Sequence, residues 1–422
     1  MASKMMNTTT YGANKQVEGV TSVTTKAWRA DRLSKLGSSI FSEVAEWKRE
    51  AQQQGLDVID LSIGSPDLPP SESIKRSLSE AVLRDTAYAY PGSKGSKGFL
   101  QQAAEWLKYR FDIQVDPELE LLSLMGSQDG LGHLALALCN PGDIALVPDP
   151  GYPVYAAGLA LAGVEPYYMP LRAENGFLPD FTAIPDEVWS KAKFMLLNYP
   201  SNPVSAVADL SFFSKAVAIA KQHNVLIVHD LAYSEMAFDG YRPPSILQVE
   251  GAVEIAVEFH SLSKSFNMAG CRIGFLAGNQ HAVSALGALK ANIDYGIFLP
   301  VQEAGIEALK QDMSGQHPSV GLLYERRRDA LLHALHQEGW DIASPKATMF
   351  VWAQLPPMTW SLSDPWNSRR ISREMLNRAG VAVIPGDAFG MEGEGYVRIA
   401  LVENEQRLIE AARRIGRFIR GE

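Results

Sequence analysis

Short apolar runs alternate with longer amphipathic stretches along this chain from residue 56 onward. The short runs are too apolar for strands with one solvated face, whereas the longer stretches have the spacing of helices. We expect strands at 57–62, 144–148, 193–198, 225–229, 255–260 and 272–277, and helices at 71–83, 99–111, 128–139 and 211–223. This alternation predicts an α/β fold in which helices cover both faces of a mostly parallel sheet. Ligands of such sheets gather at the carboxyl ends of the strands.

The rhythm changes after Pro300, where a smaller α+β domain is expected. Its expected elements are helices at 301–310 and 318–338, a strand at 348–354, a helix at 363–379, a strand at 396–401 and a helix at 403–420. An amphipathic stretch at 41–53 has no strand beside it, so we expect it to pack with this domain. The predicted division is a flexible arm at 1–30, a segment of the small domain at 31–60, a large ligand-binding domain at 61–310 and the small C-terminal domain at 311–422.

Composition narrows the possible partners. The 422 residues exceed what one core usually holds, and the formal net charge of −9 argues against nucleic acid as a partner. No apolar run approaches the roughly 18 residues that span a bilayer, so no membrane partner is expected. The two cysteines, Cys139 and Cys271, do not suggest a disulfide framework, which favours the cytoplasm. The first two dozen residues resemble a transit peptide in polarity but lack arginine, so a disordered arm is the favoured interpretation.

The segment SLSKSFNMAGCRIG at 261–274 contains the most informative residue, Lys264. A lysine is seldom buried without a chemical reason, because removing water from an ammonium is costly. One such reason is a Schiff base, in which a desolvated lysine with a lowered pKa attacks a carbonyl. Ser261, Ser263 and Arg272 would suit a phosphate on the same ligand. A phosphorylated aldehyde meets all of these requirements, which points to pyridoxal 5'-phosphate (PLP).

The ring of PLP makes further demands that the chain meets at predicted strand ends. The pyridine nitrogen needs a carboxylate, which Asp230 would supply, although a helix N-cap is an alternative for this residue. Tyr233 and the amide of Asn202 would suit the phenolic oxygen, although Asn202 also fits an ordinary Asn-Pro turn. Tyr152 would stack on the ring, or else be a half-buried turn residue.

Two further segments and Arg398 are considered as binding sites for the charged groups of a ligand. The segment 126–130 precedes a predicted helix, whose N-terminal N–H groups would bind phosphate, provided that Asp129 points away or only caps the helix. The glycine-rich run at 92–98 lacks the Walker spacing and is interpreted as a flexible turn. Arg398 alternates with apolar neighbours, so it is either exposed at a sheet edge or the clamp for a substrate carboxylate. The histidines lack the spacing of metal ligands, and no metal is expected.

Taken in order, these residues resemble the fold-type I PLP enzymes, specifically the class I and II aminotransferases, from about residue 35 to the C-terminus. The resemblance rests on Ser-x-Ser-Lys-x-x-x-x-x-Gly-x-Arg-x-Gly together with Asn202-Pro203, Asp230-x-x-Tyr233 and Arg398. It implies a homodimeric enzyme that exchanges an amino group between an amino acid and a 2-oxo acid by a ping-pong route.

The resemblance also implies a role for each matching residue. Lys264 would bind PLP as a Schiff base and then carry a proton between the substrate's α-carbon and the cofactor. Asp230 would pair with the pyridinium, and Gly64 would meet the substrate carboxylate opposite Arg398. Tyr90 would reach the phosphate in the neighbouring subunit. Tyr152 would stack on the ring, and Asn202 and Tyr233 would bind its phenolic oxygen. The residues that would hold the phosphate are Ser127, Gln128, Ser261, Ser263 and Arg272.

Some features concern the subfamily. Many relatives have Asn-Pro-Thr-Gly where this chain has Asn202-Pro203-Val204-Ser205, and Gln101 stands where an arginine is common. The segments 55–67 and 292–298 look closest to LL-diaminopimelate aminotransferases, although alanine, methionine and aromatic aminotransferases share much of this sequence. A PLP-dependent C–S β-lyase is a rival from another reaction class. A PLP-binding regulator without catalysis is a weaker one, because the short polar start leaves no room for a DNA-binding helix-turn-helix.

Overall fold

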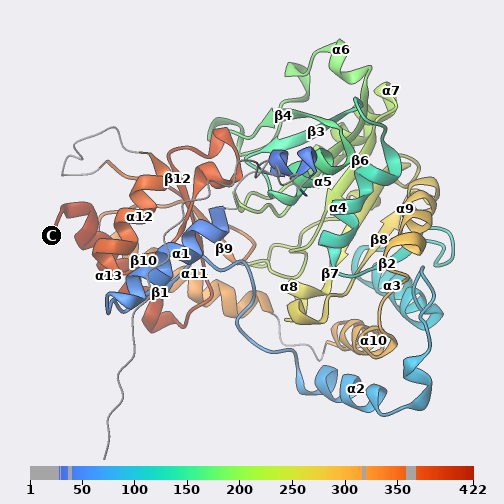
Figure 1. The fold of residues 1–422 in the computed structure, drawn as a ribbon, viewed down its shortest axis with the longest axis horizontal. Coiled ribbons are helices and arrows are strands. Elements are labelled where there is room, and N and C mark those ends of the chain that lie inside the picture. Colours follow the sequence, from blue (N-terminus) through green and yellow to red (C-terminus); the bar gives the residue numbers. More distant parts are fainter. Residues whose placement is uncertain (1–27, 29, 37–39, 316–319, 358–366) are drawn as a thin grey trace, which may run out of the picture.

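The computed structural model describes residues 28, 30–36, 40–315, 320–357 and 367–422. The expected arm at 1–30 therefore lies almost wholly outside the described residues. The largest sheet has seven strands, in the order β2-β8-β7-β6-β5-β3-β4 (Figure 1). Their bounds are β2 Leu121–Leu124, β3 Ile144–Asp149, β4 Glu165–Pro170, β5 Ala192–Asn198, β6 Leu226–Asp230, β7 Ala256–Ser261 and β8 Gly274–Gly278.

Strand β8 is antiparallel to both of its neighbours, and the other neighbouring strands of this sheet pair in parallel. The prediction of a mostly parallel sheet is thereby confirmed. Two strands were absent from the expected set. Strand β4 contains Pro166 and Pro170 and lies at the edge of the sheet, where prolines are tolerated and the periodic signal is weak. Strand β2 has only four residues, which is too short for a clear pattern.

Helices cover both faces of this sheet, as the apolar strand runs predicted. Successive strand residues alternate between two hydrophobic cores: Ile227 belongs to one and Val228 to the other. The first core lies under α3, α7 and α10, and the second under α4, α5 and α9. The helix bounds are α2 Glu72–Val82, α3 Lys97–Phe111, α4 Ser127–Leu138, α5 Val154–Ala162, α6 Asp186–Trp189, α7 Leu210–His223, α8 Leu262–Ser265, α9 Gln280–Ile293 and α10 Leu299–Met313.

A second group of elements surrounds its own core, on the left of Figure 1. A three-stranded antiparallel sheet has the order β11-β12-β9, and β1 pairs in parallel with β10. The bounds are α1 Ile40–Gln53, β1 Ile59–Asp60, α11 Val320–Gln337, β9 Phe350–Gln354, α12 Ser368–Ala379, β10 Val381–Ala382, β11 Ile384–Pro385, β12 Tyr396–Ala400 and α13 Glu405–Arg420.

The segment at 31–60 contacts both groups of elements. Helix α1 and strand β1 pack with α12, β11 and β10, whereas the short 3-10 helix Asp31–Leu36 contacts α5 beside the large sheet. Helix α10 packs with α2 and α3, and α11 packs with α13. On this basis we retain the division near residue 310 as a proposal.

Candidate active site

A cavity of about 550 Å³ opens at the carboxyl ends of β5, β6 and β7. Of the residues expected at the site, Tyr90 alone does not line it. The residues that the structure brings together here are Gly64, Ser127, Gln128, Tyr152, Asn202, Asp230, Tyr233, Ser261, Ser263, Lys264, Arg272 and Arg398. They come from segments that are up to 334 positions apart in the sequence (398 − 64), and the fold brings their side chains into one cavity.

Lys264 lies in the short helix α8, directly after β7, and its Nζ donates to the Gly64 carbonyl oxygen. Burial of the amine lowers its pKa to about 8, and the nearby charges of Arg398 and Arg272 act in the same direction. A lysine with this pKa is partly neutral near physiological pH and can therefore act as a nucleophile or a base.

Asp230 ends strand β6 and is buried. The residues after it form a turn, so the N-cap alternative does not apply. Its Oδ2 accepts a hydrogen bond from the Tyr155 hydroxyl at 2.8 Å, while its buried Oδ1 has no partner among the described residues. Burial raises the pKa of Asp230, whereas the Tyr155 bond and the charge of His229 oppose this. A buried acceptor without a donor is costly, so this oxygen suits a donor on a ligand.

Arg398 is 2% exposed and lies on β12, the middle strand of its sheet, which rules out an exposed position at a sheet edge. Its guanidinium donates to Asn202 Oδ1 at 3.0 Å and to the Ser62 carbonyl oxygen at 3.2 Å. Its guanidinium carbon lies 4.1 Å from the ring centroid of Phe350, and its Nε has no partner among the described residues. Burial lowers its pKa to about 10. A buried cation in this setting favours an anionic ligand such as a carboxylate.

The N-terminus of α4 forms a cradle below Arg272. Gly126 precedes the helix with φ +74°, and a Cβ at this position would come within 2.7 Å of the Arg272 guanidinium. Asp129 points away from the cradle, because its carboxylate accepts from the Met125 N–H and pairs with Lys290 Nζ at 2.6 Å. The free N–H groups of the helix and the exposed guanidinium therefore offer an anion site without a competing carboxylate.

Two side chains that line the cavity, Asn198 and Tyr155, had no assigned role in the sequence prediction. Asn198 Nδ2 donates to the Asp230 carbonyl oxygen at 2.8 Å, and its Oδ1 accepts from the Asn202 N–H at 2.8 Å. It thus joins the two segments that carry Asp230 and Asn202. Tyr155, which lies one helical turn after Tyr152, supplies the hydrogen bond to Asp230. Its position three residues after Tyr152 is the feature of the sequence that could have pointed to a place at the site.

The two departures from the family pattern have structural explanations. Ser205 takes the left-handed conformation, φ 56°, that glycine adopts easily, and its hydroxyl contacts Thr348 and the Phe350 carbonyl oxygen. Gln101 is exposed on α3, where it donates to Glu105. Neither residue lines the cavity.

Tyr90 lies apart from the cavity on the surface, 88% exposed, with its ring 5.5 Å from that of Tyr295. The run at 92–98 forms a turn in front of α3, and Ser96 caps that helix by accepting from the Phe99 N–H. Among the described residues, no group of three or more His, Cys, Asp or Glu is arranged to hold a metal ion. No helix in the described part of the chain has the length and apolar character needed to cross a membrane.

A family model for aminotransferase class I and II matches residues 56–415. The chain belongs to this family. The aminotransferase is therefore a PLP-dependent enzyme, and its substrates are amino acids and 2-oxo acids.

Individual relatives match nearly the whole aminotransferase. LL-diaminopimelate aminotransferase 2 of Trichormus variabilis is 43% identical over 387 residues, which cover 92% of this chain and 97% of the relative. The LL-diaminopimelate aminotransferase of Syntrophobacter fumaroxidans is 44% identical over 387 residues, with coverages of 92% and 98%. A solved structure of a probable N-succinyldiaminopimelate aminotransferase from Thermus thermophilus has a TM-score of 0.83 at 39% identity, with coverages of 90% and 99%.

Three observations indicate that PLP would fit the site of this aminotransferase. The unpartnered Oδ1 of Asp230 would accept from a protonated ring nitrogen. The cradle of Gly126 and Arg272 would hold the phosphate. The Lys264 amine, with its lowered pKa, would bind the aldehyde carbon.

Proposed function

We propose that this aminotransferase takes the amino group of LL-diaminopimelate and passes it to a 2-oxo acid by a ping-pong route. The observation that supports this substrate is the 41–44% identity to enzymes named LL-diaminopimelate aminotransferase, over 92% of this chain. Alanine, methionine or aromatic donors are the alternatives within the family, and C–S elimination is the alternative reaction.

The residues of the site divide the work of the reaction. PLP, when bound, withdraws electrons from the substrate's α-carbon and so makes its proton acidic. Asp230 would hold a positive charge at the far end of the ring, and Lys264 Nζ would take the proton from the substrate's α-carbon and deliver it to the cofactor. Arg398 and Asn202, with the Gly64 backbone, hold the α-carboxylate and so aim the C–H bond at the lysine. We propose that Ser127, Gln128, Ser261, Ser263 and Arg272 retain the phosphate.

A second cavity, of about 410 Å³, supports a substrate with two polar ends. It shares Phe41, Gln128 and Tyr152 with the main cavity. Inside it, Arg369 Nε donates to Asp387 Oδ2 at 3.2 Å, and Asp387 Oδ1 is buried without a partner among the described residues. LL-Diaminopimelate carries an ammonium and a carboxylate at each end, so we propose that its far end pairs with Asp387 and Arg369.

This pairing makes a prediction about specificity. Asp387→Asn should lower kcat/KM for LL-diaminopimelate about tenfold or more, because one charge-assisted hydrogen bond is worth roughly 1.5–3 kcal/mol. The kcat/KM for glutamate, which has no distal ammonium, should stay within about twofold. Steady-state kinetics with both donors provide the measurement, and equal losses for the two would contradict the placement of the far end.

A donor screen tests the substrate itself. The enzyme loaded with PLP is mixed with single amino donors, and the loss of the visible absorbance of the bound cofactor reports the first half-reaction. LL-Diaminopimelate should react at least tenfold faster than its meso isomer, alanine, methionine or phenylalanine. Faster reaction with any of these would replace it as the substrate. Release of ammonia and pyruvate from a C–S substrate without a 2-oxo acid would instead support the lyase.

We further propose a cytoplasmic homodimer. Tyr88, Tyr90, Tyr295 and Phe298 expose between 43% and 88% of their surface and pack as two ring pairs, Tyr88 with Phe298 and Tyr90 with Tyr295. A second copy of the chain would cover these rings and bring Tyr90 to its partner's phosphate. The free thiols of Cys139 and Cys271 fit a reducing compartment. Light scattering of the purified enzyme would test the dimer.

A further inference from the structure

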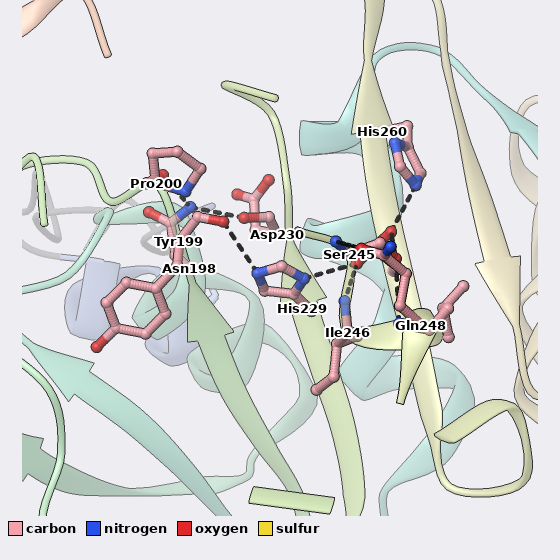
Figure 2. A network of polar contacts seen from close by, with 11 residues as sticks. Asn198, Tyr199, Pro200, His229, Asp230, Ser245, Ile246, Gln248 and His260 are labelled. Atoms are coloured by element: carbon pink, nitrogen blue, oxygen red, sulfur yellow. Dashed lines mark hydrogen bonds and ion pairs between the residues drawn. The ribbon is translucent and has the colours of Figure 1, made fainter. Parts of the chain in front are cut away.

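A buried polar network lies behind the site, on the face of the sheet that packs under α3, α7 and α10 (Figure 2). Its centre is Glu258 on β7, which is fully buried and pairs in register with His229 on β6. Glu258 Oε2 is 2.7 Å from His229 Nδ1, and its Oε1 accepts from the Ser245 hydroxyl at 2.6 Å. The Ile246 N–H donates to Oε2 at 3.0 Å, and His260 Nε2 lies 2.8 Å from Oε1.

The surroundings of His229 determine its protonation. Its Nδ1 faces the Glu258 carboxylate and its Nε2 faces the Tyr199 carbonyl oxygen at 3.1 Å, so both ring nitrogens meet acceptors. A neutral imidazole has one N–H and would leave one of these contacts without a proton. Burial raises the pKa of Glu258, but the hydrogen bond with His229 and the close contact of His260 together hold it well below its usual range. The carboxylate is therefore ionised, and an imidazolium, with a proton on each ring nitrogen, would meet both contacts of His229.

His229 is connected to the cofactor site through the backbone of β6 and through the segment that contains Tyr199. His229 immediately precedes Asp230 in β6, and the two side chains lie on opposite faces of the strand. Its Nε2–H holds the Tyr199 carbonyl, within the segment that ends at Asn202, as Figure 2 shows for Tyr199. The positive charge of His229 also favours the ionised form of Asp230, whose pKa burial alone would raise further.

We propose that Glu258 keeps His229 as a buried imidazolium, which positions the 198–202 segment and holds Asp230 as the carboxylate that the cofactor needs. The inference rests on the proposed role of Asp230. His229 and Glu258 are positioning residues, because they act through Asp230 and Asn202. Among the described residues, Glu258 on β7 pairs with His229, His260 contacts the same carboxylate, and Asp230 on the opposite face of β6 senses the charge of both histidines. Helix α7 contributes the ring of Phe213, 4.8 Å from that of His229.

The protonation state can be tested without the cofactor. In cofactor-free protein labelled with ¹⁵N-histidine, the resonances of His229 should show both ring nitrogens protonated at neutral and mildly alkaline pH. Comparison with the His229→Gln spectrum assigns them. A neutral ring at neutral pH would overturn the proposal, and it would do so whatever amino acid proves to be the substrate.

The consequence for the cofactor is tested with three variants. Glu258→Gln removes the carboxylate, the double variant Glu258→Gln/His229→Gln removes both charges while keeping polar partners, and Glu254→Gln is the control on an exposed ion pair with Lys221. Glu258→Gln should let His229 lose its proton and so raise the pKa of Asp230. A rise of about one unit makes binding of pyridoxamine 5'-phosphate about tenfold weaker at pH values below that pKa. Because that pKa rises, the loss of binding at low pH should move to higher pH.

The double variant separates positioning from packing. It leaves no unpaired buried charge, so its thermal stability should recover towards that of the wild-type enzyme, while the cofactor affinity stays at least about fivefold reduced. The Glu254→Gln control should match the wild type in both measurements. If affinity and stability recover together in the double variant, the network serves packing alone and the proposal is wrong.

Discussion

At the scale of single residues, the protein holds charged groups in surroundings that favour their neutral forms. Burial lowers the pKa of Lys264 and of Arg398, and it raises the pKa of Asp230. Short motifs singled out these three residues, but they left alternatives open for Asp230 and Arg398, and the family resemblance supplied the roles proposed for them. Tyr155 was missed because its partner Asp230 lies 75 positions away (230 − 155), so the contact exists only in the folded chain.

Replacing the lysine tests the central assignment. Lys264→Ala should reduce turnover by at least about a thousandfold, because both the covalent bond to the cofactor and the base at the α-carbon are lost. The visible absorbance of the bound cofactor should change as well. The circular dichroism spectrum should match that of the wild type, since the side chain lines a cavity. Retention of normal turnover would refute the role of Lys264.

The lowered pKa of Lys264 predicts a pH dependence. The neutral amine is the reactive form, and its fraction rises with pH up to the pKa. The rate at which cofactor-free enzyme takes up PLP should therefore increase until about pH 8 and then level off, instead of rising towards the ordinary value of 10.5. Stopped-flow absorbance over a pH series measures this rate. A continued rise far beyond pH 8 would show that the amine is not desolvated in solution.

At the scale of elements, periodicity predicted the buried parallel strands well, but the expected set lacked the strands at the edges of the large sheet and the helices α5 and α9. Strands β3, β5, β6 and β7 are buried over nearly their whole length, whereas β4 is largely exposed and contains two prolines. The pairing of His229 with Glu258 depends on the register of β6 against β7. Sequence spacing does not fix that register, so the histidines were considered only as metal ligands.

The start of α4 supplies a prediction at this scale. Gly126→Ala should weaken cofactor binding about tenfold or more and cost roughly 1–2 kcal/mol of stability, because alanine is strained at positive φ and its Cβ would meet Arg272. Gly132→Ala is the matched control within the same helix, since its Cβ would have nothing within 4 Å. That control should raise the stability by up to about 1 kcal/mol and leave binding unchanged. Dialysis against PLP and thermal denaturation measure the two effects.

At the scale of the whole molecule, the site is made by both groups of elements. The large sheet provides Lys264 and Asp230, whereas Arg398 comes from the small sheet, so the carboxylate clamp depends on how the two pack. The sequence predicted a large and a small domain divided near residue 310, and this division stays a prediction. The position of Tyr90 outside the cavity could be anticipated only through the family resemblance, because its proposed partner belongs to another chain.

Mixing two inactive variants tests whether sites are shared. If Tyr90 serves the neighbouring subunit, Lys264→Ala and Tyr90→Ala chains should each have low activity alone. Mixed dimers should contain one complete site, so random reassociation should restore about a quarter of the wild-type activity. Mixtures of Lys264→Ala with wild-type chains provide the reference for reassociation. No recovery beyond the sum of the separate variants would mean that Tyr90 acts within its own subunit or not at all.

The antiparallel direction of strand β8 has a consequence for the length of cofactor that the enzyme can bind. Strands β7 and β8 are antiparallel and pair Ser261 with Gly274, so the connection at 262–273, which contains α8 and the 3-10 helix Ala269–Cys271, turns back on itself. Lys264 and Arg272 both lie on this connection, so the groups proposed for the two ends of the cofactor are joined by a fixed length of backbone. The length of this connection therefore limits the distance between the two groups. Cofactor analogues with a longer link between ring and phosphate should therefore be excluded by the length of this connection, even where every contact group is retained.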